Sequence, residues 1–241
     1  MKSTTITNSE YLFKPPVAFS CREIKYGKQY VNFYSIFTRT KSQTPRCTGM
    51  HINAEEILKQ HVSKTIDLTD EQFSYFFSHF EQQSYKKGQR IISEGDNVEN
   101  EYFVLDGCLK SFYINDEVKM FILQFAMPTW WASDYNALYN GTRATINVDC
   151  ITNAETLSLS NTSREKLCKE IHQVEYFFRW RTNRGYAAAQ KKMLSFMNND
   201  ARHRYEELMA QYPALYNLVP KHLIAAYLGV SRETLSRLYN S

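Results

Sequence analysis

Hydrophobic and polar positions change their period twice along the chain. From residue 51 to residue 82, apolar side chains recur every three or four positions, which predicts helices. Thr69, followed by two acids and Gln72, is typical of a helix N-cap within this segment. From residue 83 to about residue 159 the period is two, and beyond it the helical period returns. The chain therefore divides into a helical, a β-rich and a second helical segment.

The β-rich segment consists of short pieces separated by turn residues. Glycines stand at the breaks between the pieces, at Gly88, Gly95, Gly107 and Gly141. Many short strands with regular turns are typical of a small antiparallel barrel or sandwich. The pieces cover residues 90–92, 101–105, 109–114, 118–125, 145–151 and 156–159.

The second helical segment predicts one long helix over residues 162–198. Thr162 or Ser163 is positioned to cap its first turn. Gly185 lowers the stability of such a helix by about 1 kcal/mol relative to alanine but does not force a break. Residues 198–200, Asn-Asn-Asp, then form a hinge and the cap of a following helix.

The C-terminal stretch 221–239 reads KHLIAAYLGVSRETLSRLY and predicts two short amphipathic helices around a tight turn. Gly229 supplies the positive φ that the turn needs, and Ser231 caps the second helix. Arginine can bond the O6/N7 edge of guanine twice, and glutamate can accept from cytosine N4. The alternative is an ordinary helical hairpin with a charged face. The shared core is expected from Ile224, Leu228, Val230, Leu235 and Leu238.

This segment resembles the helix-turn-helix of the Crp/Fnr family of bacterial transcription regulators. The run from Ser231 to Arg237 matches the family signature S-R-E-T-x-x-R. The resemblance implies that Arg232, Glu233 and Arg237 read base edges and that Ser231 and Thr234 contact phosphate. The family usually has a β-hairpin wing after this helix, and the sequence ends at Ser241, so a helix-turn-helix without a wing is expected. The predicted DNA-binding residues are Ser231, Arg232, Glu233, Thr234, Ser236, Arg237 and Lys221.

The resemblance extends back through the β-rich segment. Residues 87–96, KGQRIISEGD, resemble the family pattern K-G-x-x-I-x-x-E-G-D, and residues 102–110 resemble Y-x-(I/V)-x-x-G-x-(V/L)-K. Both are turn-glycine patterns, so they imply the β-roll of cyclic nucleotide-binding domains and not a bound ligand. Trp130, Trp131, Tyr135 and Tyr102 are expected in the core of the roll, with an apolar ligand pocket as the alternative.

Nucleotide-binding family members carry G-E-(L/I) and, about ten residues later, R-(S/T)-A. There the glutamate takes the ribose hydroxyl and the arginine neutralises the cyclic phosphate. A gapless alignment places Ser133-Asp134 and Ala144-Thr145 at these positions, with Arg143 one residue early. On a strand, a one-residue slip points a side chain to the other face. We therefore expect no cyclic nucleotide cofactor, an unidentified effector, and a candidate effector pocket of Ser133, Asp134, Arg143, Ala144 and Thr145.

The formal charge of the 241-residue chain is +4, which invites a prediction of nucleic-acid binding. Residues 1–49 hold eight basic and two acidic side chains, a net +6, which leaves −2 for residues 50–241. The first 49 residues also hold three of the six prolines and show no sustained period. We interpret them as a disordered or non-native extension, with Met50 as a candidate true start. The DNA-binding prediction therefore rests on the positions of a few side chains in the predicted recognition helix and not on net charge.

The sequence contains none of the motifs that would indicate a membrane protein, a disulfide-rich protein, a metalloprotein or a common class of enzyme. The longest nearly apolar run, residues 120–127, is far below the roughly 20 residues that span a bilayer. Five scattered cysteines without a C-x-x-C pair disfavour disulfides, zinc and an iron–sulfur cluster, and fit the cytoplasm. No G-x-S-x-G, P-loop or G-x-G-x-x-G is present, so no enzyme and no metal site is expected.

The expected fold class is α+β: an antiparallel β-roll (jelly roll), a long dimerisation helix and a C-terminal helix-turn-helix. The expected boundaries are 1–49 for the extension, 50–161 for the roll, 162–198 for the helix and 199–241 for the DNA-binding domain. The predicted function is transcription regulation by a homodimer on a palindromic double-stranded DNA operator, with RNA polymerase as a further partner and no membrane. The alternative is a ligand-binding or scaffolding module whose helix-turn-helix no longer binds specific DNA.

Overall fold

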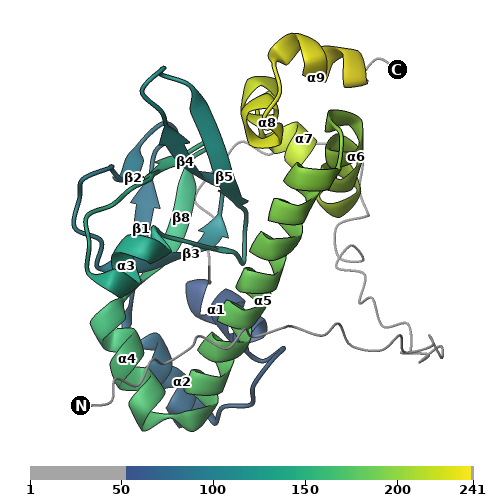
Figure 1. Cartoon of the computed structure of the whole chain (residues 1–241). Coiled ribbons are helices and arrows are strands. Elements are labelled where there is room, and N and C mark those ends of the chain that lie inside the picture. Colours follow the sequence, from purple (N-terminus) through teal and green to yellow (C-terminus); the bar gives the residue numbers. More distant parts are fainter. Residues whose placement is uncertain (1–52, 240–241) are drawn as a thin grey trace, which may run out of the picture. The chain divides into compact units, whose positions relative to one another are not determined.

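The computed structural model describes residues 53–239, so the predictions for residues 1–49 and for Met50 lie outside the described residues. Within these residues, eight strands form two four-stranded antiparallel sheets, in the orders β1-β8-β3-β6 and β2-β7-β4-β5. Figure 1 shows the strands on one side of a long helix. The predicted β-roll within an α+β chain is thereby confirmed. The strands are β1 (Phe80–Tyr85), β2 (Arg90–Ile92), β3 (Asn100–Asp106), β4 (Leu109–Ile114), β5 (Met120–Ala126), β6 (Trp131–Ala132), β7 (Asn147–Cys150) and β8 (Ala154–Ser160).

Two helices precede the roll, α1 (Ala54–Val62) and α2 (Asp70–Phe77). Thr69 caps α2 as predicted: its hydroxyl accepts from the Gln72 backbone, and the Gln72 side chain accepts from the Thr69 backbone. The prediction of helix as far as residue 82 was wrong. Phe80 begins β1, because the strand pairs with β8 from Phe80 opposite Leu159 onward. Phe80 still packs edge-to-face on Phe76, with 5.0 Å between ring centroids.

Within the roll, β2 and β4 coincide with the predicted pieces, and β5 begins two residues later than predicted. Val118 lies in the turn before β5 with φ of +61°, a conformation that a strand does not adopt. The strand β6 and the short helix α3 (Tyr135–Asn140) were not predicted.

Three apolar clusters organise the described residues. The first lies between the sheets and takes side chains from both, including Val104, Ala132 and Val148. The opposite face of the β1-β8-β3-β6 sheet packs on the helices that flank the roll, through residues such as Phe103. The opposite face of the other sheet, with Phe125, packs on the C-terminal helices. The roll is therefore covered by helices on both outer faces.

The helical segment after the roll is divided into α4 (Asn161–Glu170) and α5 (His172–Asn198). The predicted single helix over 162–198 was wrong at Ile171, which has extended φ and ψ of −127° and 103° and is buried in the core. Ser160, and not Thr162 or Ser163, caps α4 by accepting from the Ser163 backbone at 3.0 Å. The helix α5 continues through Gly185 without a break.

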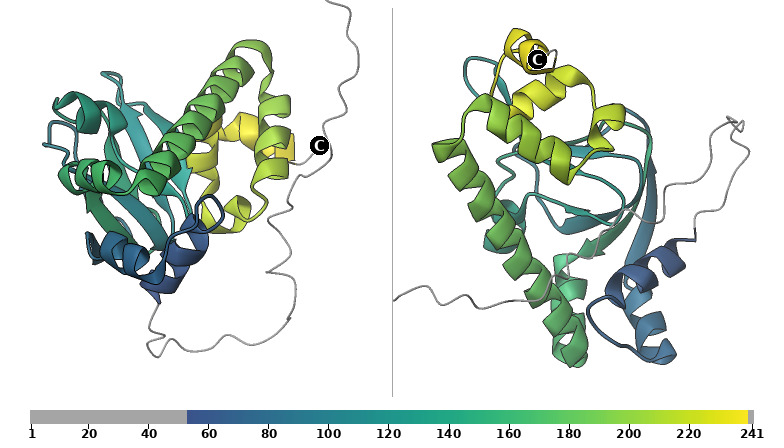
Figure 2. Two further views of the ribbon diagram at one scale, coloured as in Figure 1. Left: turned by 90° about the horizontal axis from the view of Figure 1, so that it is seen from below. Right: turned by 90° about the vertical axis from the view of Figure 1, so that its right-hand side faces the viewer.

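Four shorter helices follow, grouped around the C-terminal end of α5 (Figure 2). Asp200 caps the first of them as predicted, because its carboxylate accepts from the His203 backbone at 2.8 Å. They are α6 (Ala201–Gln211), α7 (Leu215–Leu218), α8 (Lys221–Leu228) and α9 (Arg232–Tyr239). None of the helices among residues 53–239 has the length and hydrophobicity that crossing a membrane requires.

Candidate nucleic-acid interface and effector site

The helices α8 and α9 are joined by a tight turn at Gly229. Its φ is +70°, and its N–H donates to the Ala225 carbonyl, closing α8 in the left-handed conformation that glycine adopts most readily. A Cβ at this position would lie 3.3 Å from the Phe196 ring, so the turn also packs closely on α5. Ile224, Leu228 and Leu235 of the predicted shared core are buried, and Val230 and Leu238 are half-buried.

Ser231 caps α9, as its position after the turn predicts. Its hydroxyl accepts from the Thr234 backbone at 3.1 Å and lies 3.1 Å from the Thr234 hydroxyl. Arg237 Nη2 reaches the same hydroxyl at 3.5 Å. Hydrogen bonds from its own backbone and from Ser231 lower the pKa of Glu233, which therefore stays ionised at neutral pH. The start of α9 is ordered by its own polar groups.

The predicted base-reading residues share one surface. Arg232, Glu233, Ser236 and Arg237 line a single shallow depression and are exposed. Thr234 is half-buried by its part in the cap. Lys221 is exposed at the start of α8 and shares a second hollow with Arg232. The structure thus brings the predicted set together on the outer side of the α8–α9 pair.

Residues that the sequence did not indicate hold this helix pair to the roll. The Tyr227 ring of α8 lies 5.2 Å from the Phe125 ring of β5. Lys192 of α5 donates to the Leu123 carbonyl at 2.6 Å, and its Nζ lies 3.7 Å from the Tyr227 ring centroid. Burial lowers the pKa of Lys192 to about 8. A lysine in an amphipathic helix usually faces water, so no sequence signal marks this contact.

In the roll, the carboxylate of Asp134 is fully engaged by the protein itself. Oδ1 accepts from the Ala137 backbone at 3.1 Å and caps α3. Oδ2 accepts from the Thr145 backbone at 2.7 Å, the Thr145 hydroxyl at 3.1 Å and the Ile146 backbone at 3.2 Å. Burial raises the pKa of this carboxyl, but these hydrogen bonds outweigh burial and hold the pKa below its ordinary value. Asp134 is 2% exposed.

The other residues of the predicted effector pocket also serve the fold. The Ser133 hydroxyl donates to the Asn100 carbonyl at 2.8 Å. Ala144 is buried, and its backbone bonds across to the loop that holds Gly95 and Asp96. Arg143 is exposed, and no hydrogen bond among the described residues joins it to Asp134. The structure therefore brings Asp134 and Thr145 together and leaves Arg143 apart from them.

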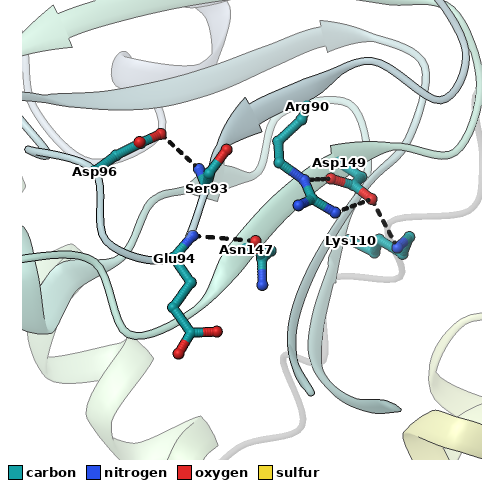
Figure 3. Close-up of polar contacts among 7 residues, drawn as sticks. All are labelled: Arg90, Ser93, Glu94, Asp96, Lys110, Asn147 and Asp149. Atoms are coloured by element: carbon teal, nitrogen blue, oxygen red, sulfur yellow. Dashed lines mark hydrogen bonds and ion pairs between the residues drawn. The ribbon is translucent and has the colours of Figure 1, made fainter. Parts of the chain in front are cut away.

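The outer side of the β2-β7-β4-β5 sheet carries a polar cluster that the sequence did not indicate (Figure 3). Asp149 accepts from Arg90 Nε at 2.8 Å and from Lys110 Nζ at 3.0 Å. In the adjoining turn, Asp96 accepts from the Ser93 backbone and Asn147 accepts from the Glu94 backbone. The acidic residues of the E-G-D motif therefore belong to a turn of the fold, consistent with the interpretation of this motif as structural.

A buried ion pair that the sequence did not indicate links α5 to the roll. Arg181 Nη2 lies 2.5 Å from Glu101 Oε2 of β3, and the guanidinium lies 4.2 Å from the centroid of the Trp131 ring. Glu101 is completely buried, so removing its partner would leave an uncompensated charge. The pair fixes the position of α5 on the sheet.

The cysteines Cys108 and Cys150 are buried in the roll. Burial raises the pKa of Cys108 to about 12 and that of Cys150 to about 11, so both are thiols at neutral pH. No group of three His, Cys, Asp or Glu side chains within this range could hold a metal ion.

Comparison with known proteins defines the class of fold. Residues 82–170 match the family model of the cyclic nucleotide-binding domain. The chain is similar to FixK2 from Bradyrhizobium japonicum, with 21% identity, a TM-score of 0.58, and coverage of 67% of this chain and 83% of FixK2. It is also similar to CLP, a c-di-GMP responsive global regulator from Xanthomonas campestris, with 14% identity, a TM-score of 0.57, and coverage of 71% and 90%.

A third similar structure comes from Eubacterium rectale and is assigned to the Crp/Fnr family of transcriptional regulators. It shares 14% identity with a TM-score of 0.58, and the match covers 72% of this chain and 83% of that protein. No curated protein matches the chain in sequence. The resemblance to the Crp/Fnr regulators is thereby confirmed at the level of the fold.

Proposed function

We propose that this protein is a DNA-binding transcription regulator of the Crp/Fnr type, with α9 as its recognition helix. The observation that carries the proposal is the exposed face of α9, where Arg232, Glu233, Ser236 and Arg237 share one surface above a buried core. An ordered helix with exposed arginine and glutamate can enter the major groove and bond to base edges. Lys221 and the cap at Ser231 would then contact phosphates.

The proposed functional unit is a homodimer formed through α5. This helix exposes large apolar side chains along its C-terminal half, including Tyr186 at 71%, Met193 at 60% and Met197 at 71%. Such a run of exposed apolar surface marks a protein–protein interface more often than a solvated face. Pairing of two parallel helices would place the two α9 helices about 34 Å apart, one turn of DNA, and imply a palindromic operator.

The proposed effector of the roll is not a cyclic nucleotide. A site for a cyclic phosphate needs hydrogen-bond donors and a cation that converge on the phosphate oxygens. The Thr145 and Ile146 donors are used by the carboxylate of Asp134, which would also repel a phosphate. Arg143 is exposed and has no hydrogen bond to this carboxylate within the described range. The effector pocket of Ser133, Asp134, Arg143, Ala144 and Thr145 therefore stays a prediction, and we propose no ligand for it.

The second candidate function is a ligand-binding or scaffolding module that does not bind specific DNA. The net charge of −2 over residues 50–241 favours it, because phosphate attraction supplies much of DNA affinity. The exposed arginines of α9 favour the first candidate, because positioned side chains decide specificity whatever the net charge.

Selection of bound fragments from a genomic library tests the proposal. The purified full-length chain is expected to enrich a palindromic sequence, and a gel shift should then retain that sequence over a scrambled competitor. The specific complex should survive a competitor excess of roughly a thousandfold, as specific affinities commonly exceed non-specific ones by that factor. Equal retention of the scrambled sequence would contradict the proposal and favour the scaffolding alternative.

A further inference from the structure

The C-terminal helices form a partly open cavity of about 170 Å³ beside the recognition surface. Its walls come from α6, α7, α8 and α9, so it lies within the helical group itself and not in the roll. Tyr205, Tyr216, Ile224 and Leu235 supply apolar walls, and Lys221 and Arg232 stand among its polar lining residues. Ile224 and Leu235 are buried, so the floor of the cavity is part of the core shared by α8 and α9.

The size and walls of the cavity set the shape of an occupant. An apolar protein cavity of about 150 Å³ holds one benzene molecule and excludes water when its walls offer no polar partners. A cavity of about 170 Å³ with aromatic and aliphatic walls therefore fits a single six-membered ring.

The charged lining residues set the chemistry of the occupant. Lys221 Nζ lies 5.6 Å from the centroid of the Tyr216 ring, so the ammonium is held beside the apolar wall. Arg232 is exposed, and none of the described residues that line the cavity is acidic. His222 also lines it, but burial and the nearby Arg232 and Lys110 lower its pKa, so it is neutral at pH 7. Two cations beside an apolar wall are complementary to one carboxylate.

We propose that this cavity binds a small aromatic carboxylate, with the ring against Ile224 and Leu235 and the carboxylate between Lys221 and Arg232. Both cations belong to the proposed DNA-binding set. A bound carboxylate therefore neutralises two groups that would otherwise face DNA, and it adds a negative charge next to the phosphates. This regulatory consequence rests on the proposed function, whereas the binding itself does not.

Calorimetric titration of the full-length chain with three probes tests the binding. One benzoate is expected to bind per chain, with a Kd on the order of 0.1–1 mM, which is typical of a ligand with so few non-hydrogen atoms. Benzamide keeps the ring and shape but carries no charge, and it should bind about tenfold more weakly. Acetate keeps the carboxylate without the ring and should show no saturable binding at benzoate's working concentrations. Benzamide binding as tightly as benzoate would overturn the proposal, as would no binding of benzoate.

Two variants and a control locate the site. Lys221→Gln should weaken benzoate about tenfold and leave benzamide unchanged, since only the charged partner is lost. Ser236→Phe, at the cavity lining, should weaken both ring compounds by filling the space. Lys87→Gln removes an equally exposed lysine from the turn before β2 and should change neither. Unchanged benzoate affinity in both site variants would place the binding elsewhere and refute the assignment.

A DNA-retention assay separates this inference from the function on which its regulatory part depends. With the selected operator, benzoate at several times its Kd should reduce retention, and benzamide should not. Benzoate binding without retention of any DNA sequence would leave the site standing and contradict the proposed function. Operator retention without benzoate binding would contradict the site and leave the function standing.

Discussion

Asp134 and Ser231 both cap a short helix, but the helices they begin have opposite surroundings. Asp134, at the start of α3, is buried, and four donors of the protein occupy its carboxylate. Ser231 starts α9 at the surface, and the residues that follow it, Arg232 and Glu233, are exposed. A buried polar group must find its partners within the protein, whereas an exposed one remains available to another molecule. Burial therefore commits the Asp134 carboxylate to the fold, whereas exposure leaves the α9 side chains available for the recognition that we propose.

The largest effect is expected from Asp134→Ala. The substitution leaves the part-buried backbone donors of Thr145 and Ile146 without this partner and removes the cap of α3. It should lower the free energy of unfolding by about 3 kcal/mol, measured by urea denaturation. Asp116→Ala, in the exposed turn before β5, is the matched control and should stay within about 0.5 kcal/mol. A loss below about 1 kcal/mol in Asp134→Ala would contradict a stabilising role for this buried carboxylate.

The same carboxylate predicts a pH dependence with a defined sign. The folded pKa of Asp134 is below its ordinary value, so its stabilising contribution is complete above the unfolded pKa, about 3.9. The contribution is lost as the pH falls through the folded pKa. The gap in stability between the natural protein and Asp134→Asn should therefore be constant from pH 7 to pH 5 and close below pH 4. A gap that is unchanged at pH 2.5 would contradict a stabilised carboxylate.

A smaller effect is expected from Lys192, which contacts both β5 of the roll and Tyr227 of α8. Its contribution to the unfolding free energy should change by about 2 kcal/mol between pH 8 and pH 10. The folded pKa of Lys192 is about 8 and the unfolded pKa is about 10.4, so folding disfavours its charge. The cost is complete below pH 8 and is relieved as the pH rises toward 10, because the unfolded chain then binds more protons. The stability of the natural protein relative to Lys192→Met should therefore increase between pH 8 and pH 10. Parallel unfolding curves across this range would mean that the ammonium is not desolvated.

The smallest effect is expected from Ser231→Ala, which sharpens the contrast between the two caps. The hydroxyl accepts from the Thr234 backbone at an exposed site, where water can replace it. The loss of unfolding free energy should be about 1 kcal/mol, well below that of Asp134→Ala. Ser231→Asp retains a cap and should restore stability. Equal losses in Ser231→Ala and Asp134→Ala would show that burial does not distinguish the two positions.

Local sequence signals predicted much of this fold because their causes are local. The cap at Thr69 needs only Gln72 three residues away, and the turn at Gly229 needs only a residue that tolerates positive φ. The α9 surface was predicted for the same reason, since exposure follows from the apolar spacing within one helix. These features depend on neighbours within one or two turns of chain.

The features that the sequence did not predict depend on distant contacts. Phe80 continues the helical spacing of Phe76, but pairing with Leu159 places it in a strand. Ile171 has no helix-breaking neighbour, and it interrupts the helix in an extended conformation while its side chain lies in the core. Asp134 accepts from the backbones of Thr145 and Ile146, which lie 11 and 12 residues later, just before β7. The sequence alignment could not show these contacts and predicted only a ligand contact for Asp134. At Phe80 and Ile171, tertiary packing decides against the local pattern.

Operator binding by the double variant Arg232→Ala, Arg237→Ala tests the central claim most directly. Fluorescence anisotropy with the selected sequence should show a loss of affinity of at least a hundredfold, since each arginine–guanine pair contributes about 1–3 kcal/mol. Lys86→Ala, Lys87→Ala removes the same charge from an exposed turn of the roll and should lose no more than about threefold. Urea unfolding should be unchanged in both. Operator affinity that stays within threefold in the arginine variant would contradict the assignment of recognition to α9.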